Sequence, residues 1–282
     1  MFDRTEEDVG NIVELGHVNV TVPDQSLATL FYVSGLGLTR DPYMMTGLDN
    51  MWVNAGHAQF HLPSRPKAQV LRGVIGLVVP DLDALRARLE RVAPALKGTR
   101  FTVADGPDGS VEATCPWGNR MRVHEPDPAR FGPMTLGMPY VALHVPPGTT
   151  AGITRFYRTV LNAHATATAG QARVLAGSGG ALLFVETDAA PPAFDGHHIQ
   201  ITLADFSGPY RRLLDRDLVT AEDDQHQYRF CDIVDPNDGR VLFTVEHEVR
   251  SLRHPMFGRV LINRNPAQNN RDYVGGKDFW PI

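Results

Sequence analysis

The sequence has 282 residues, of which 43% are hydrophobic and 21% are charged, and its formal net charge is −5. This is enough apolar material for one or two buried cores. An acidic balance without a basic stripe excludes a nucleic-acid partner, and no apolar run reaches the roughly 18 residues that a membrane span needs. The acidic residues 1–8 are not typical of a signal peptide, so we expect a cytoplasmic protein that acts on a small molecule.

One short pattern occurs four times along the chain. In each copy an alternating apolar strand ends in a turn, a helical pattern follows, and about 40 residues of short strands complete the unit. The copies read HVNVTVPD at 17–24, VIGLVVPD at 74–81, YVALHVPP at 140–147 and HIQITLAD at 198–205. The sequence therefore predicts four repeated βαβββ modules.

Module 1 shows the expected elements most clearly. Residues 15–22 alternate, so His17 and Asn19 share one face of a strand. Asp24 or Ser26 can cap the following helix, and a meander of three strands is then predicted near 39–44, 48–54 and 57–62. Because the crossover helix covers one face of the sheet, we expect the polar face to line a cavity.

The modules fall into two similar pairs, because copies one and three are offset by 140 − 17 = 123 residues and copies two and four by 198 − 74 = 124. We predict an α+β fold of four βαβββ modules in two tandem pairs, forming curved half-barrel sheets around a cavity. The predicted domains are an N-terminal pair at 1–126, a C-terminal pair at 136–249 and a C-terminal extension at 250–282. Four aromatic residues of the extension indicate docking on the body or on a second copy in a homodimer: Phe257, Tyr273, Phe279 and Trp280.

The repeated unit resembles a known superfamily. Its Phe31-Tyr32 pair in the helix, the Phe60-His61-Leu62-Pro63 strand end and the Pro-Asp strand exit are similar to those of vicinal oxygen chelate proteins. These proteins include glyoxalase I, extradiol dioxygenases, fosfomycin resistance proteins and bleomycin-binding proteins. The resemblance covers residues 12–248, and it implies that two modules form a cup. A divalent metal in the cup would be held by the first and last strands of both modules.

The resemblance also implies which positions would hold the metal. The first-strand position falls on His17, Val74, Tyr140 and His198 in modules 1 to 4. The last-strand position falls on His61, Arg122, Phe184 and, in module 4, Leu242 or Phe243. No carboxylate occupies these positions. The nearest one in module 4, Glu246, lies three or four residues after the expected last-strand position.

Module pairing decides which site these residues can build. In a cup of modules 1 and 2, His17 and His61 would face Arg122, and His198 would lie in the other cup. In a cup of modules 1 and 4, His17, His61 and His198 converge, and three imidazoles can hold a divalent transition metal such as Fe, Zn, Mn or Ni. The sequence leaves both pairings open.

Further candidates surround these histidines. We expect His57 or His226 to move a proton. The predicted substrate-binding residues are Trp52, Arg122, Tyr140, Phe184 and Glu246. A pocket wall for His57, surface exposure for Arg122 and core packing for Tyr140 are the alternatives.

Two classes of function follow. The first is a metal-dependent lyase, isomerase or dioxygenase that chelates two vicinal oxygens of a small oxygen-rich or aromatic substrate. The alternative is a metal-free protein of the bleomycin-resistance type that binds or sequesters a small molecule. The matched first-strand histidines favour the enzyme, and the missing carboxylates favour the binder.

Overall fold

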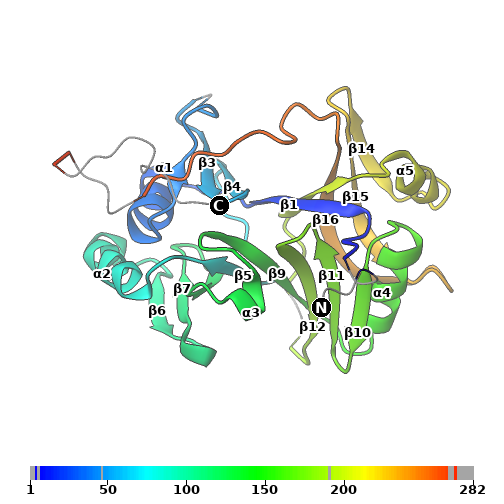
Figure 1. The fold of residues 1–282 in the computed structure, drawn as a ribbon, viewed down its shortest axis with the longest axis horizontal. Helices are drawn as coiled ribbons and strands as arrows, with labels where there is room; N and C mark the ends of the chain where they lie inside the picture. Colours follow the sequence, from blue (N-terminus) through cyan, green and yellow to red (C-terminus); the bar gives the residue numbers. More distant parts are fainter. Residues whose placement is uncertain (1–3, 5–6, 46, 190–191, 266–269, 272–282) are drawn as a thin grey trace. The chain divides into compact units, whose positions relative to one another are not determined.

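The computed structural model describes residues 4, 7–45, 47–189, 192–265 and 270–271. The architecture is α+β, with two mixed sheets of eight strands each and a few helices (Figure 1). Four βαβββ modules follow one another along the chain, as the repeated pattern predicted. The predicted fold class is confirmed.

Modules 1 and 2 contain most of the short helices. Their elements are β1 (Ile12–Asn19), α1 (Gln25–Ala28), η1 (Thr29–Gly35), β2 (Thr39–Arg40), β3 (Asn50–Ala55), β4 (Ala58–Pro63), β5 (Gly73–Val78), α2 (Leu82–Val92), η2 (Ala93–Leu96), β6 (Thr102–Asp105), η3 (Pro107–Gly109), β7 (Val111–Thr114), β8 (Arg120–His124) and α3 (Pro128–Phe131). Asp24 caps α1, because its carboxylate accepts from the backbone N–H groups of Ser26 and Leu27 at 2.7 and 2.9 Å. The helix then continues as the π-helix η1, which the sequence did not predict.

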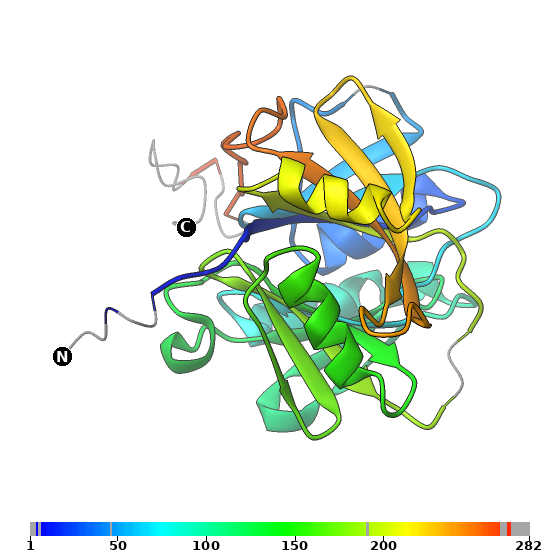
Figure 2. The same ribbon diagram turned by 90° about the vertical axis from the view of Figure 1, so that its right-hand side faces the viewer.

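Modules 3 and 4 have longer strands. Their elements are β9 (Gly137–Val145), α4 (Thr150–Thr159), β10 (Ala165–Thr168), β11 (Gln171–Ala176), β12 (Gly180–Glu186), β13 (His198–Leu203), α5 (Ser207–Leu214), β14 (Val219–Asp223), β15 (Gln227–Val234) and β16 (Val241–Ser251). Helix α4 packs on β10, β11, β12 and β15. In the turned view its green coil lies beside the yellow-green strands of module 3 (Figure 2).

In every module the first strand pairs in parallel with the last one. The four pairs are β1 with β4, β5 with β8, β9 with β12, and β13 with β16. This pairing brings first-strand and last-strand side chains next to one another. The sheet orders are β14-β15-β16-β13-β1-β4-β3-β2 and β10-β11-β12-β9-β5-β8-β7-β6, so modules 1 and 4 share one sheet and modules 2 and 3 share the other.

The chain divides into two compact units that each combine two separate segments. One unit contains residues 1–16 and 140–259, and the other contains residues 17–139 and 260–282. We call them the 140–259 unit and the 17–139 unit after their longer segments. Each unit therefore depends on a short segment that is distant in the sequence.

Asn11 anchors the short segment of the 140–259 unit. Its Nδ2 group donates to the backbone oxygens of Leu161 and Asp205 at 2.8 and 2.9 Å, and its Oδ1 accepts from the Asp205 N–H at 2.5 Å. The side chain is buried. One residue thus satisfies three backbone groups in modules 3 and 4.

Asn263 has the corresponding role in the 17–139 unit. Its Nδ2 donates to the Gly56 oxygen at 2.8 Å, and its Oδ1 accepts from the Gly56 N–H at 2.9 Å. Asn54 donates to the backbone oxygen of Ile262 at 2.8 Å. This part of the predicted extension therefore packs within its own chain. Of the aromatic residues on which that prediction rested, Tyr273, Phe279 and Trp280 lie outside the described residues.

A polar pair lies inside the core of the 140–259 unit. The Tyr157 hydroxyl donates to Nε2 of His247 at 2.6 Å, while Nδ1 of His247 donates to the Val245 oxygen at 2.9 Å. The imidazole stacks on Phe230 with 4.2 Å between ring centroids. Burial lowers the pKa of His247 to about 3, which means that the ring is neutral in the native protein.

This buried histidine predicts a loss of stability in acid. The ordinary pKa of histidine is 6.5, so below that pH the unfolded chain binds a proton that the native state takes up only near pH 3. The stability present above pH 6.5 should therefore fall by about 1.4 kcal/mol per pH unit on acidification. Urea unfolding midpoints between pH 7 and 4.5 should show a shallower pH slope for a Tyr157→Phe, His247→Leu double variant. Equal slopes would contradict a neutral His247.

Candidate metal centre

Two of the predicted metal ligands lie close together in the 17–139 unit. His17 comes from β1 and His61 from β4, and their ring centroids are 5.8 Å apart. Trp52 on β3 stacks on His61 with a centroid distance of 3.9 Å and an interplanar angle of 12°. Trp52 also packs in a T-shaped arrangement with His17, with 5.0 Å between the ring centroids. The indole thus restricts both imidazoles to defined orientations.

A hydrogen bond favours one tautomer of His61. Nε2 of His61 lies 2.7 Å from Oδ1 of Asn50, the first residue of β3. Because Oδ1 can only accept, Nε2 carries the proton and Nδ1 keeps its lone pair. Nδ1 is therefore the nitrogen that can bind a metal ion.

The third predicted ligand, His198, lies in the 140–259 unit between two carboxylates. Its Nδ1 is 3.3 Å from Oε2 of Glu246, and its Nε2 is 3.5 Å from Oε2 of Glu248. The parallel register of β13 and β16 causes this, since His198 pairs with Glu246 and Gln200 with Glu248. His198 is buried, so these contacts lie largely away from bulk water.

Two arginines neutralise the carboxylates beside His198. On β15, Nη1 of Arg229 lies 3.2 Å from Oε2 of Glu246, and Nη2 of the same residue pairs with Oε2 of Glu248. Arg250 contacts the other oxygen of Glu248 at 2.6 Å. Burial alone would raise the pKa of Glu246, but the hydrogen bond from His198 and the charge of Arg229 outweigh burial and lower it. Glu246 is therefore ionised at neutral pH.

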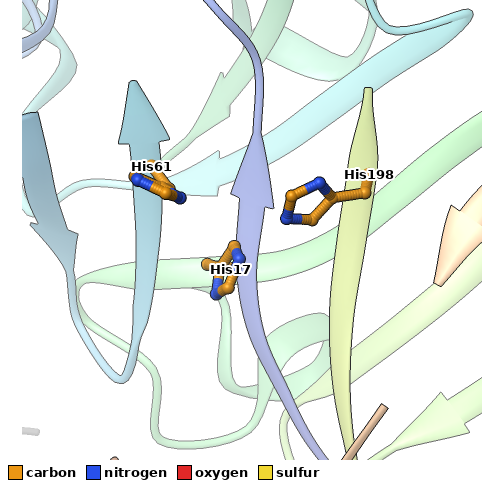
Figure 3. Close-up of side chains that lie close together, drawn as sticks. All are labelled: His17, His61 and His198. Carbon is orange, nitrogen blue, oxygen red and sulfur yellow. The ribbon is translucent and has the colours of Figure 1, made fainter. Parts of the chain in front are cut away.

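The three histidines form one group. One ring nitrogen from each of His17, His61 and His198 lies within 4.8 Å of the other two, and Figure 3 shows the rings turned toward one another from β1, β4 and β13. It is the one such group of three among the residues that the structure describes. Nitrogen ligands of a tetrahedral metal site are about 3.4 Å apart for metal–nitrogen bonds of about 2.05 Å. The donor set suits a transition metal.

The last-strand position of module 4 differs from the expected one. In module 1, His61 pairs with Asn19, two residues after the first-strand histidine. In module 4, the residue paired with the corresponding Gln200 is Glu248. The expectation of Leu242 or Phe243 was wrong, and so was the expectation that no carboxylate stands there. Module 4 places this position later in the sequence because β15 and β16 have 8 and 11 residues, whereas β3 and β4 have 6 each.

The other predicted site residues are more scattered. His57 is exposed between β3 and β4, and His226 is exposed between β14 and β15 with φ of 62°. Arg122 on β8 pairs with Glu112 at 2.6 Å. Tyr140 is half-buried on β9, whereas Phe184 is fully buried in the core against Tyr157. Trp52 and Glu246 directly contact members of the histidine group.

Sequence reasoning missed Asn50, Arg229 and Glu248. The alternation of Glu246, Glu248 and Arg250 along β16 was a usable signal, because these three residues share one strand face. Asn50 gives no such signal, since its contact with His61 depends on the β3–β4 pairing.

Comparison with known structures identifies the fold. Glyoxalase I from Zea mays is 12% identical over 84% of this chain and 91% of its own, with a TM-score of 0.57. A candidate dioxygenase from Bacillus subtilis subsp. subtilis is 15% identical over 87% and 86%, with a TM-score of 0.56. The chain has the vicinal oxygen chelate fold. The resemblance predicted from the repeats is thereby confirmed at the level of fold.

Other comparisons add little. No family model matches the sequence, and no curated protein matches it. In the described part of the chain, no helix has the length and apolar character required to cross a membrane. The chemistry of this protein must therefore be argued from its own side chains.

Proposed function

We propose that the protein is a metal-dependent enzyme of the vicinal oxygen chelate type, a lyase, isomerase or dioxygenase acting on a small oxygen-rich or aromatic substrate. One observation carries the proposal: His17, His61 and His198 each offer a nitrogen within 4.8 Å of the others. His17 and His198 lie on the first strands of modules 1 and 4. Metal binding accounts for three buried or half-buried imidazoles whose nitrogens lie close together, because neutral imidazole is the commonest metal ligand in proteins.

The donor set favours Fe, Zn, Mn or Ni, with coordination positions left for two substrate oxygens. A bound ion would supply Lewis acidity toward those oxygens. The protein itself holds the ligands ready. Asn50 keeps the proton of His61 on Nε2, and Glu246 accepts a hydrogen bond from Nδ1 of His198. Both contacts favour one tautomer and one ring orientation.

The surrounding residues suggest the substrate class. Trp52, with His61 stacked on it, provides a flat aromatic surface beside the group of histidines. Such a surface favours a planar or aromatic substrate. For proton transfer, Glu246 is better placed than His57 or His226, because it contacts His198 and is ionised. His57 and His226 stay candidates for substrates that extend to their turns.

A metal-free binder of small molecules is the second candidate. The observation in its favour is that both carboxylates beside His198 pair with arginines, so that neither is offered to a metal. In that case the histidines and Trp52 would contact the guest directly.

Metal content separates the two candidates. Protein purified without chelator should contain about one transition-metal ion per chain, since three imidazoles bind such ions at neutral pH. Elemental analysis of the purified protein and of protein reconstituted with Fe, Zn, Mn or Ni checks this. Less than about a tenth of an equivalent after reconstitution would leave the metal-free binder.

A further inference from the structure

The pair of arginines beside Glu248 points to a property of the proposed metal centre, and the inference rests on that proposed function. We propose that Arg229 and Arg250 hold Glu248 away from the metal, so that the centre has three histidine ligands and keeps the full positive charge of its ion. Arg229 and Arg250 are then positioning residues, and Glu248 becomes a metal ligand only when its ion pair with an arginine is lost.

The first step is the equivalence of Glu248 and His61. Both residues lie on the last strand of their module and pair with the residue two positions after the first-strand histidine. Since the first and last strands of both modules run in parallel, the two side chains project from matching places. Where module 1 offers an imidazole to the metal, module 4 therefore offers a carboxylate.

The second step is the proximity of this carboxylate to the centre. Oε2 of Glu248 lies 3.5 Å from Nε2 of His198. Glu248 nevertheless does not belong to the group of ligand atoms that lie within 4.8 Å of one another. It is close enough for a side-chain rotation to bring it to a metal and is not in place to bind one.

The third step is the cause of this position. Arg229 holds Oε2 of Glu248, and Arg250 holds Oε1 at 2.6 Å. Glu248 is only 4% exposed, so it cannot exchange these partners for water. A buried carboxylate that loses an arginine must find another positive charge, and a metal ion at the histidines is near. The two ion pairs thus compete with the metal for Glu248.

The charges explain what the arrangement achieves. Glu246 and Glu248 carry two negative charges, and Arg229 and Arg250 carry two positive ones, so the four side chains together are neutral. A divalent ion on three neutral imidazoles then keeps a charge of +2, whereas coordination by Glu248 would reduce it to +1. The higher charge polarises substrate oxygens more strongly and favours a substrate whose oxygen pair is anionic.

Cobalt titration tests the arrangement, because Co²⁺ absorbs visible light with an intensity that falls as the coordination number rises. Four proteins are compared: wild type, Glu248→Gln, Arg229→Met, and the double variant with both changes. Arg86→Met is the matched control, since Arg86 makes an exposed ion pair with Asp105. Circular dichroism checks that each protein is folded.

We expect Glu248→Gln to leave the cobalt spectrum unchanged, because Glu248 is not a ligand, and to weaken cobalt affinity through the uncompensated arginine charge. Arg229→Met should bind cobalt on the order of tenfold more tightly and with weaker absorption, since the released carboxylate joins the three histidines. The double variant should return to the wild-type values.

Two results would overturn the inference while leaving the metal centre intact. One is a Glu248→Gln protein whose cobalt spectrum differs from that of wild type, which would make Glu248 a ligand already. The other is an Arg229→Met protein that matches wild type and the control. If Arg229→Met does not fold, Glu248→Gln alone decides. A wild type that binds no cobalt would instead overturn the proposed function, and the inference with it.

Discussion

Replacing His17 by alanine should abolish metal binding. The variant loses one of three imidazole donors, and the remaining two, His61 and His198, make an incomplete site. We expect metal affinity to fall by a factor of at least about 100, since even removal of a residue that only supports a ligand costs 10- to 100-fold. Elemental analysis after dialysis and competition with a chromogenic chelator measure the loss.

The same result should follow for His61→Ala and His198→Ala, because each supplies one nitrogen of the group. His164→Ala is the control, since His164 is exposed and outside the group. If His17→Ala retained a full equivalent of metal at wild-type affinity, the three histidines would not be the binding site. The function would then have to be sought in the metal-free alternative.

Replacing Asn11 by alanine should cause a large loss of stability. The substitution removes three hydrogen bonds and leaves backbone groups of Leu161 and Asp205 without their partner in a buried place. We expect the 140–259 unit to lose about 3 kcal/mol, because unsatisfied buried backbone groups cost about 1–3 kcal/mol each and partial relaxation recovers some of this. Urea unfolding followed by circular dichroism measures the change.

Asn263→Ala tests the corresponding anchor in the 17–139 unit and should shift the transition of that unit by a similar amount, since two bonds to Gly56 are lost. Asn237→Ala is the control, because Asn237 is exposed, and it should change stability by no more than about 0.5 kcal/mol. An Asn11 variant as stable as the Asn237 variant would show that the short segment contributes little to its unit.

Much of the fold could be predicted because it repeats. The alternating first strands gave the number and order of the modules, and Asp24 was recognised as a helix cap from local chemistry alone. The three histidines were predicted as one of two alternatives, because the pattern shows which residues share a strand face but not which modules share a sheet. In the sheet order β13 neighbours β1, whose residues 12–16 belong to the 140–259 unit.

The electrostatics around His198 could not be predicted in the same way. Glu248 was missed because β15 and β16 are longer than β3 and β4, so that it comes 248 − 198 = 50 residues after His198, whereas His61 comes 61 − 17 = 44 residues after His17. Arg229 is on a different strand, and it contacts Glu246 and Glu248 because it pairs with Glu248 between β15 and β16. Local patterns therefore located the three histidines, whereas the charged residues beside His198 depend on strand pairing.

Each unit combines two segments that are distant in the sequence, and this has a consequence for biosynthesis. A ribosome completes residues 17–139 well before residue 263, so Gly56 has to wait for Asn263 until 207 further residues have been added. Asn11 likewise has to wait for Asp205, which follows it by 194 residues. Each unit should therefore reach its final form only after both of its segments have been synthesised.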